Sequence, residues 1–305
     1  MKTIGLAIAW NWEFDADFVV GVERECIVRD VSALEATSRN LSKILHELKM
    51  GEISFHAFYD RASDADDAFL PLVTLLDQPA IRVINSHKLV LHAIDKATMH
   101  LEFITHGLNV PFTIILPPYN MNGAVDIPMR DLDHLLKPFV IKPANTTGGG
   151  TGVVLDARTI KDVAEARTLH PDDKYLVQEF VHPRDLGGKR AWFRIYSVFG
   201  EIIPCWWDDK THMYTVLSQN DEDQFGLSAL HEIMTTIQTI CKLDFFSSEV
   251  ALTEEGKFVV VDYVNEICDM RLQSKYRNGA PDAVVHRIEW LIAREVASSI
   301  ERTIR

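Results

Sequence analysis

The most constraining stretch of the sequence runs from Phe245 to Arg271 and reads FFSSEVALTEEGKFVVVDYVNEICDMR. Two runs of β-forming residues flank the polar, glycine-containing segment 253–256, a pattern typical of two strands joined by a tight turn. Side chains alternate along a strand, so one face of each strand should be apolar. Glu249 and Asp262 interrupt that pattern with carboxylates.

These two acidic side chains are predicted to lie near each other. If Leu252 pairs with Lys257 across the turn, Glu249 lies diagonal to Asp262 on the same face. Like charges on a partly buried sheet are costly unless a cation lies between them. Mg²⁺ is the expected cation because it takes hard oxygen ligands, and Asn265 would add a third oxygen. The alternative is that both carboxylates line a solvated face of the sheet.

The composition describes an ordinary soluble globular protein that is large enough for two domains. The chain has 305 residues, 47% hydrophobic and 25% charged. Its formal net charge of -13 argues against nonspecific binding to nucleic acid or to an anionic membrane, because both need a cationic surface. Local clusters of Lys and Arg can still bind an anionic ligand.

The four cysteines are scattered and form no CxxC pair, so the sequence indicates neither a zinc site nor a disulfide framework. Residues 4–10 are apolar but too short for a signal peptide or a membrane span. We therefore expect reduced thiols and a cytoplasmic protein. A homo-oligomer is compatible with these features.

The first 90 residues predict a small open α/β domain. Strands are expected at 3–9, 53–59 and 80–85, with a helix at 32–49 and a second helix that begins near Ser63 or Asp64 and ends at Leu76. Residues 10–18 are expected to form a loop. Such sheets bind ligands at the carboxyl ends of their strands, where Trp10, Asp60, Arg61 and Ser86 would lie. Trp10 and Trp12 are candidate substrate-side groups. The alternatives are that the tryptophans cover the core and that Arg61 forms a surface ion pair with Asp60 or Asp64.

A glycine-rich segment indicates a phosphate site. A predicted strand delivers Lys142, and the loop after it contains Gly148, Gly149, Gly150 and several threonines. Adjacent glycines let backbone amides turn toward an anion, while the lysine offsets its charge. The spacing fits neither the P-loop nor the dinucleotide fingerprint. A flexible turn is the alternative.

The rest of the chain predicts further strands and helices. Strands are expected at 110–116, 175–181, 189–199 and 201–207, and helices at 86–107, 132–136, 226–243 and 283–303. The backbone of strand 175–181 can bond a purine edge. In strand 189–199, Arg194 shares a face with Arg190 and Trp192 and is the expected phosphate clamp, since guanidinium binds phosphate through paired donors.

Taken together and in this order, these motifs resemble the ATP-grasp superfamily, including its glutathione synthetase, ribosomal-protein glutamate ligase and inositol phosphate kinase branches. The resemblance covers about residues 86–271 and implies an N-terminal α/β domain (1–90) followed by an ATP-grasp domain of two α+β subdomains (91–305). Each motif is weak alone, whereas their common order is specific.

The resemblance also implies a role for each motif. Lys96 and Lys142 would contact the α and β phosphates, and Gly148, Gly149 and Gly150 would belong to a lid over the triphosphate. Gln178, Glu179, Phe180 and Val181 would meet adenine, and Asp185 the ribose. Arg194 would face the transferred phosphoryl group. Glu249, Asp262 and Asn265 would hold Mg²⁺, or Mn²⁺ in its place, and Arg271 would bind phosphate or an acidic substrate.

Two departures from the family pattern bear on the site. Tyr263 and Val264 both separate Asp262 from Asn265, where the family usually has one residue, so we predict a bulge or strand end there. Without it, Asn265 is not a ligand. In addition, Trp192 stands where the family often has an acid two residues before its arginine, which leaves the acceptor site open.

The predicted function is an ATP-dependent, ADP-forming ligase that joins a small carboxylate or amino-acid substrate to an amine through an acyl phosphate. Charge on the transferring phosphoryl group would be offset by Mg²⁺ and the cationic side chains. A small-molecule kinase on the same scaffold and a non-catalytic nucleotide-binding module are the alternatives.

Overall fold

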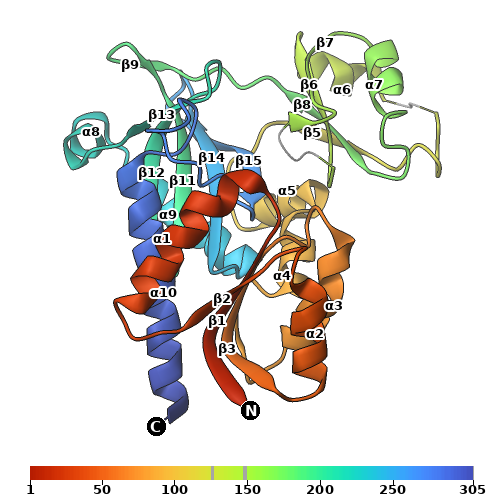
Figure 1. Ribbon diagram of the computed structural model, residues 1–305. Coiled ribbons are helices and arrows are strands. Elements are labelled where there is room, and N and C mark those ends of the chain that lie inside the picture. Colours follow the sequence, from red (N-terminus) through yellow and green to blue (C-terminus); the bar gives the residue numbers. More distant parts are fainter. Residues whose placement is uncertain (125–126, 147–149, 305) are drawn as a thin grey trace.

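The computed structural model of the protein describes residues 1–124, 127–146 and 150–304. An N-terminal parallel sheet lies at one end of the molecule and two antiparallel sheets lie at the other (Figure 1). This architecture confirms the predicted fold class of an open α/β region followed by α+β regions.

The N-terminal sheet has the strand order β2-β1-β3-β4, and all its pairings are parallel. Its strands are β1 (Lys2–Trp10), β2 (Ala33–Ala36), β3 (Ile53–Arg61) and β4 (Arg82–Ile84), and its helices are α1 (Ala16–Ile27), α2 (Leu41–Lys49) and α3 (Leu70–Leu76). Residues 4–9 of the central strand β1 are all buried because helices cover both faces of the sheet.

Three local predictions in this domain were wrong in part. The segment 32–49 holds the edge strand β2 before α2, and α1 begins within the segment 10–18 that was expected to be a loop. The buried residues of α1 recur at helical spacing, so its signal was present in the sequence. The helix expected to begin near Ser63 starts later, with a 3₁₀ turn at Asp67–Phe69 capped by Asp66 and followed by α3.

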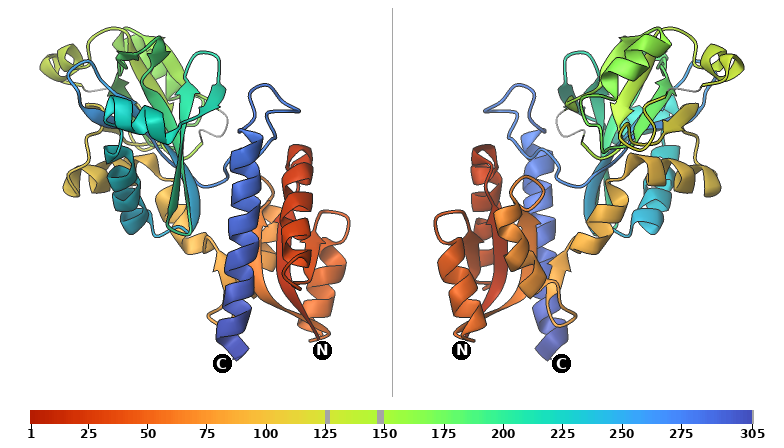
Figure 2. Two further views of the ribbon diagram at one scale, coloured as in Figure 1. Left: turned by 90° about the vertical axis from the view of Figure 1, so that its left-hand side faces the viewer. Right: turned by 90° about the vertical axis from the view of Figure 1, so that its right-hand side faces the viewer.

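The closing helix α10 (Asp282–Ile304) returns to the N-terminal domain. It runs beside α1 and packs against α1, β1 and β3 (Figure 2). Its residues Ile288, Leu291, Ile292 and Val296 are buried in the same core as Leu6 and Ile8 of β1. The predicted helix 283–303 is confirmed, and the domain division after residue 90 stays a prediction.

A four-stranded antiparallel sheet, β5-β8-β6-β7, forms a separate layer with two short helices. Its elements are β5 (Thr113–Leu116), α6 (Met129–His134), β6 (Phe139–Pro143), β7 (Val154–Ala157), α7 (Ile160–Ala166) and β8 (Tyr175–Glu179). Its strand β6 contains Lys142, and the glycine-rich loop begins directly after this strand.

The central sheet has the order β13-β12-β11-β14-β15 and is antiparallel throughout. Its strands are β11 (Trp192–Val198), β12 (Glu201–Asp208), β13 (Met213–Val216), β14 (Phe245–Leu252) and β15 (Phe258–Asn265). The remaining elements are α4 (His87–Ala93), α5 (Lys96–Thr105), the hairpin β9 (Asp185–Leu186) and β10 (Lys189–Arg190), α8 (Gln219–Phe225) and α9 (Ala229–Cys241). The single helix expected at 86–107 is therefore two, because Asp95 begins a new helix as its N-cap.

All four cysteines are buried free thiols, as the scattered sequence positions predicted. Within the described ranges, no helix combines the length and apolarity needed to cross a bilayer.

Candidate functional site

The candidate site centres on the antiparallel pair β14 and β15. Glu249 lies directly opposite Asp262, closer than the diagonal arrangement that the sequence predicted. The difference has two sources. Leu252 pairs with Phe258 and not with Lys257, so the predicted pairing at the turn was wrong by one residue, and one extra residue of β15 lies between the Val250–Val260 and Glu249–Asp262 pairs. The two carboxylates therefore lie opposite each other in the middle of two adjacent strands.

The predicted irregularity before Asn265 is confirmed. Ser247 pairs with Asn265 while Glu249 pairs with Asp262, so three residues of β15 span the same distance as two of β14. In the amide orientation that satisfies its neighbours, Asn265 Oδ1 accepts a hydrogen bond from Arg194 Nη1 at 3.1 Å. The extra residue thus brings Asn265 to the Arg194 side of the site.

Glu249 is held by two donors from the neighbouring strand β11. The Arg194 guanidinium forms an ion pair with Glu249 Oε1, and the Trp192 indole donates to Glu249 Oε2 at 3.0 Å. Arg194 also lies over the Trp207 ring, with 5.1 Å between its Cζ atom and the ring centroid. Arg194 and Glu249 face each other across β11 and β14, so their pairing follows from the strand register.

Two lysines from distant parts of the chain approach Asp262. Lys96, at the start of α5, places Nζ 3.8 Å from Asp262 Oδ1. Lys142, from β6, is buried, and its Nζ donates to Val261 O at 3.0 Å. Lys96 and Lys142, which come from two other elements, thus lie near Asp262 in the middle of β15.

Burial and charge shift the pKa values of these groups. Burial is the largest effect on Lys142 and, together with the charge of Lys96, lowers its pKa, while Asp262 and Glu249 raise it; the pKa that results is about 8. Burial raises the pKa of Asp262, but Lys96, Lys142 and Arg194 outweigh burial and hold it below its ordinary value. Asp262 is therefore ionised at neutral pH.

A buried polar network lies beneath these charges. Tyr263 OH is 2.6 Å from His100 Nδ1 and accepts a hydrogen bond from Gln178 Nε2 at 2.8 Å. Lys142 lies over the Tyr263 ring, with Nζ 5.3 Å from its centroid. Sequence reasoning missed Tyr263 and His100, because a tyrosine in a strand and a histidine in a helix match the ordinary core pattern.

The glycine-rich loop is anchored at its start. Asn145 and Thr146 both donate to the carboxylate of the buried Asp173, through backbone and side-chain groups, at 2.8–3.0 Å. Gly148 and Gly149 lie outside the described residues. Gly150 has φ +81, a conformation that L side chains rarely adopt. The described part of the loop therefore begins from a fixed point next to β6.

The segment after β8 offers backbone donors. Glu179 bonds Phe112 through both its backbone N–H and its carboxylate. Beyond it, the backbone N–H groups of Phe180 and Val181 make no hydrogen bond to another described residue. The Gln178 side chain is committed to Tyr263 and Thr113, so it faces the core.

Asp185 and Arg271 are both engaged by protein groups. Asp185 is exposed and accepts a hydrogen bond from Gly188 N, which closes the β9–β10 hairpin. Arg271 forms an ion pair with Asp269 and lies between the rings of Trp12 and Tyr276, 5.7 and 5.6 Å from their centroids. Any ligand of Arg271 would compete with Asp269.

Arg61 is buried, which corrects the expectation of a surface ion pair with Asp60 or Asp64. Its guanidinium bonds both carboxylate oxygens of Asp15, at 2.6 and 3.0 Å, and donates to Cys268 O at 2.9 Å. Arg61 thus connects β3 of the N-terminal sheet to the segment after β15. Sequence spacing did not reveal this pair because Asp15 lies 46 residues away.

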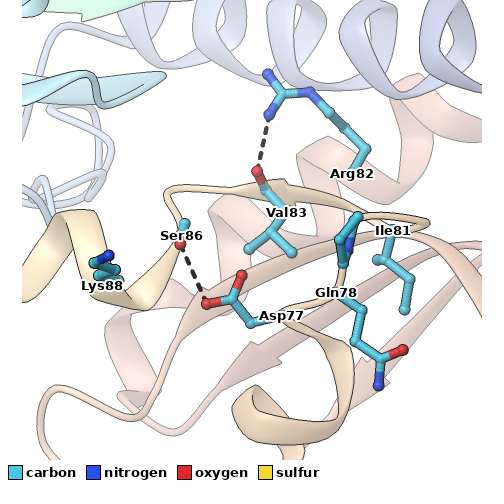
Figure 3. A pocket seen from close by; sticks show the side chains of 8 residues that line it. Asp77, Gln78, Ile81, Arg82, Val83, Ser86 and Lys88 are labelled. Carbon is cyan, nitrogen blue, oxygen red and sulfur yellow. Dashed lines mark hydrogen bonds between the residues drawn. The ribbon is translucent and has the colours of Figure 1, made fainter.

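Two open pockets of the structure do not include the paired carboxylates. One of about 390 Å³ is lined by Asn145, Thr146, His170 and Asp173 at the glycine-rich loop. The other, of about 480 Å³, lies where β4 leads into α4 and is lined by Asp77, Arg82, Ser86 and Lys88 among others (Figure 3). No group of three or more His, Cys, Asp or Glu side chains in the described ranges is arranged to hold a metal.

Comparison with known proteins identifies the fold. No protein-family model matches the sequence, and no curated protein matches it significantly. Solved structures match over nearly the whole chain. The D-alanine–D-alanine ligase of Bacillus anthracis, complexed with ATP, has a TM-score of 0.65 at 13% identity and covers 99% of both chains.

Two further solved structures agree. Macrocyclase MdnC of Microcystis aeruginosa, bound with precursor peptide MdnA, has a TM-score of 0.66 at 11% identity, covering 97% of this chain and 99% of its own. ATP-grasp ligase PsnB, complexed with a minimal precursor, Mg and ADP, has a TM-score of 0.61 at 13% identity, covering 97% and 98%. The protein therefore has the fold of the ATP-grasp ligases.

Proposed function

We propose that this protein is an ATP- and Mg²⁺-dependent ligase that joins a carboxylate to an amine through an acyl phosphate. The observation that carries the proposal is the meeting of Lys96 and Lys142 with Asp262, directly opposite Glu249. Each buried charge costs several kcal/mol unless it is compensated. Charged side chains from three elements that lie together in this way therefore indicate a role in function and not in stability alone.

The donor set fits a magnesium nucleotide. Glu249, Asp262 and Asn265 offer hard oxygen atoms on adjacent strands, the ligand type that Mg²⁺ and Mn²⁺ prefer. Mg²⁺ would offset negative charge on the phosphates. Lys96 and Lys142 would bind the phosphates, because both ammonium groups are already held at the site in the protein. The PsnB complex with Mg and ADP supports this reading by analogy of fold.

The nucleotide base would lie against the segment after β8. The backbone N–H groups of Phe180 and Val181 make no protein hydrogen bond, so they can donate to a purine edge. Val181 belongs to an apolar cluster with Trp192, Ala251 and Val259, which would exclude water from one side of the ring. Gln178 and Asp185 would act by shaping this segment, since both side chains are used by the protein.

Arg194 would stabilise the transferring phosphoryl group. Its guanidinium is oriented by Glu249 and Asn265 and stacks on Trp207, so its position is fixed before substrate binds. The carboxylate substrate would then lie on the Arg194 side of the metal, toward Trp12 and Arg271. Its chemical class can be an amino acid or a peptide, because the similar structures include a D-alanine–D-alanine ligase and a macrocyclase bound with a precursor peptide.

The test is Mg²⁺-dependent ADP formation with a panel of amino acids and small carboxylates. Glu249→Ala and Asp262→Asn should each abolish it, whereas Glu254→Gln, an exposed acid in the same hairpin, should leave it unchanged. The proposal would be contradicted if the folded Glu249→Ala and Asp262→Asn variants retained wild-type turnover.

A second experiment separates the ligase from a kinase with a hydroxyl acceptor. Hydroxylamine should trap the activated carboxylate as a hydroxamate in the absence of the amine. ADP release without hydroxamate, accompanied by a stable phosphate ester, would assign the kinase instead.

A further inference from the structure

Trp192 is buried at the edge of the candidate site and carries one polar atom. The residue is 8% exposed and packs with Val181, Ala251 and Val259. Its Nε1–H points to Glu249 Oε2, with the two atoms 3.0 Å apart. A buried indole N–H needs a partner, and here the partner is the carboxylate proposed to bind the metal.

The contact leaves Glu249 held at both oxygen atoms. Arg194 holds Oε1 and Trp192 holds Oε2, and both donors come from β11. The arginine offsets the charge of the Glu249 carboxylate. The indole N–H is a donor that does not ionise, so it fixes the orientation of the carboxylate without adding charge. Removal of the indole N–H would let the carboxylate rotate about its side chain while the ion pair with Arg194 remained.

We infer that Trp192 is a positioning residue that orients Glu249 toward the divalent metal. The inference rests on the proposed function. Hydrogen bonds to metal-ligating carboxylates fix their orientation, and loss of such a partner typically weakens metal binding 10- to 100-fold. Because the same ring packs on Val181, Trp192 also connects the proposed adenine segment to the metal ligand.

The chain contains a matched control for this contact. Trp206, on the adjacent strand β12, is also buried and donates its indole N–H to a carboxylate, Asp221 Oδ2, at 3.3 Å. Asp221 lies in the first turn of helix α8 and has no contact with Glu249 or Asp262 among those described here. Trp206→Phe therefore removes an equivalent hydrogen bond away from the site.

The experiment measures Mn²⁺ affinity by electron paramagnetic resonance in the presence of a non-hydrolysable ATP analogue, alongside metal-free affinity for the same analogue. Trp192→Phe should weaken Mn²⁺ binding by about tenfold or more and should change metal-free analogue binding by a smaller factor, because phenylalanine keeps an aromatic ring beside Val181. Trp206→Phe should match wild type in both. Equal Mn²⁺ affinity in Trp192→Phe and wild type would overturn the inference while leaving the proposed function intact.

A second substitution at Trp192 separates the loss of the hydrogen bond from a folding defect. Site-specific substitution of Trp192 by β-(3-benzothienyl)alanine keeps the shape of the indole and replaces the N–H by sulfur. It should show the same loss of Mn²⁺ affinity, and wild-type affinity would overturn the inference. If wild-type protein bound no Mn²⁺ together with the analogue, the proposed function itself would fall.

Discussion

The charged side chains of the candidate site differ in how far the sequence alone could place them. Glu249 and Asp262 were predictable because carboxylates broke an otherwise apolar strand pattern. Their direct opposition was not, because it depends on the register at the turn and on one extra residue in β15 between Val260 and Asp262. Arg271 was expected to face a ligand, yet it bonds Asp269, a partner only two residues away that the strand and loop pattern did not single out.

At this scale, Lys142 gives the first prediction. Lys142→Met should weaken ADP binding by about 10- to 100-fold, because a charge-assisted hydrogen bond contributes about 1.5–3 kcal/mol. Isothermal titration calorimetry with Mg²⁺ present measures the change. Lys257→Met, an exposed lysine in the β14–β15 hairpin, is the control and should bind ADP as wild type does. Equal affinity in Lys142→Met and wild type would exclude Lys142 from the phosphate site.

Among the secondary-structure elements, strands with strong apolar runs were predicted well, and helix boundaries less so. β1, β3, β14 and β15 appear where alternation or burial required them. The helix expected at 86–107 is broken because Asp95 caps α5, accepting hydrogen bonds from Ala97 N and Thr98 N. That break matters for the site, since it places Lys96 in the first turn of α5. Helical periodicity alone could not locate it.

The contact between α5 and β15 gives a prediction about pH. Burial lowers the pKa of His100 to about 4, with Lys142 adding to the effect, so His100 is neutral in the folded protein. An unfolded histidine titrates near pH 6.5, so between pH 6.5 and 4 the unfolded state binds the extra proton. This contribution to stability is complete above pH 6.5 and is lost as the pH falls toward 4.

We expect about 1–2 kcal/mol of the free energy of unfolding to be lost through His100 between pH 7 and pH 5. Urea denaturation of wild type and His100→Gln at both pH values measures it, and the loss should be smaller in the variant by that amount. The control is His106→Gln, which replaces an exposed histidine directly after α5. This variant should lose as much free energy of unfolding as wild type does between the two pH values. An identical pH dependence for wild type and His100→Gln would contradict a neutral buried histidine.

Over the whole molecule, the sequence predicted the kinds of layers but not how they join. Buried hydrogen bonds between residues far apart in the chain connect the N-terminal region to the central sheet and the segment after it. Asn85, at φ +60, bonds Asp244, Phe245 and Glu266, while Arg61 reaches Cys268. Single-sequence patterns carry no information about such long-range pairs, so α10 was predicted as a helix without its docking site.

The contacts of Arg61 with Asp15 and with Cys268 O give a prediction about stability. Arg61→Met should destabilise the protein by about 3–5 kcal/mol, because it leaves the buried Asp15 carboxylate unpaired. Adding Asp15→Asn should recover part of that loss, since the unpaired charge is then removed. Lys161→Met, which breaks an exposed ion pair with Glu165, should change stability by less than about 1 kcal/mol. Urea denaturation followed by circular dichroism tests all three, and a loss at Arg61 no larger than at Lys161 would contradict this account of the Arg61 contacts.

The central claim is that acidic oxygens on β14 and β15 hold the metal of a nucleotide complex. Anomalous diffraction from crystals grown with Mn²⁺ and ADP tests it most directly, because the metal position is measured independently of any activity. The account predicts a strong Mn²⁺ peak bonded to oxygen atoms of both Glu249 and Asp262, with ADP phosphates beside Lys96 and Lys142. Bound Mn²⁺ and ADP with the metal peak away from these two carboxylates would contradict it.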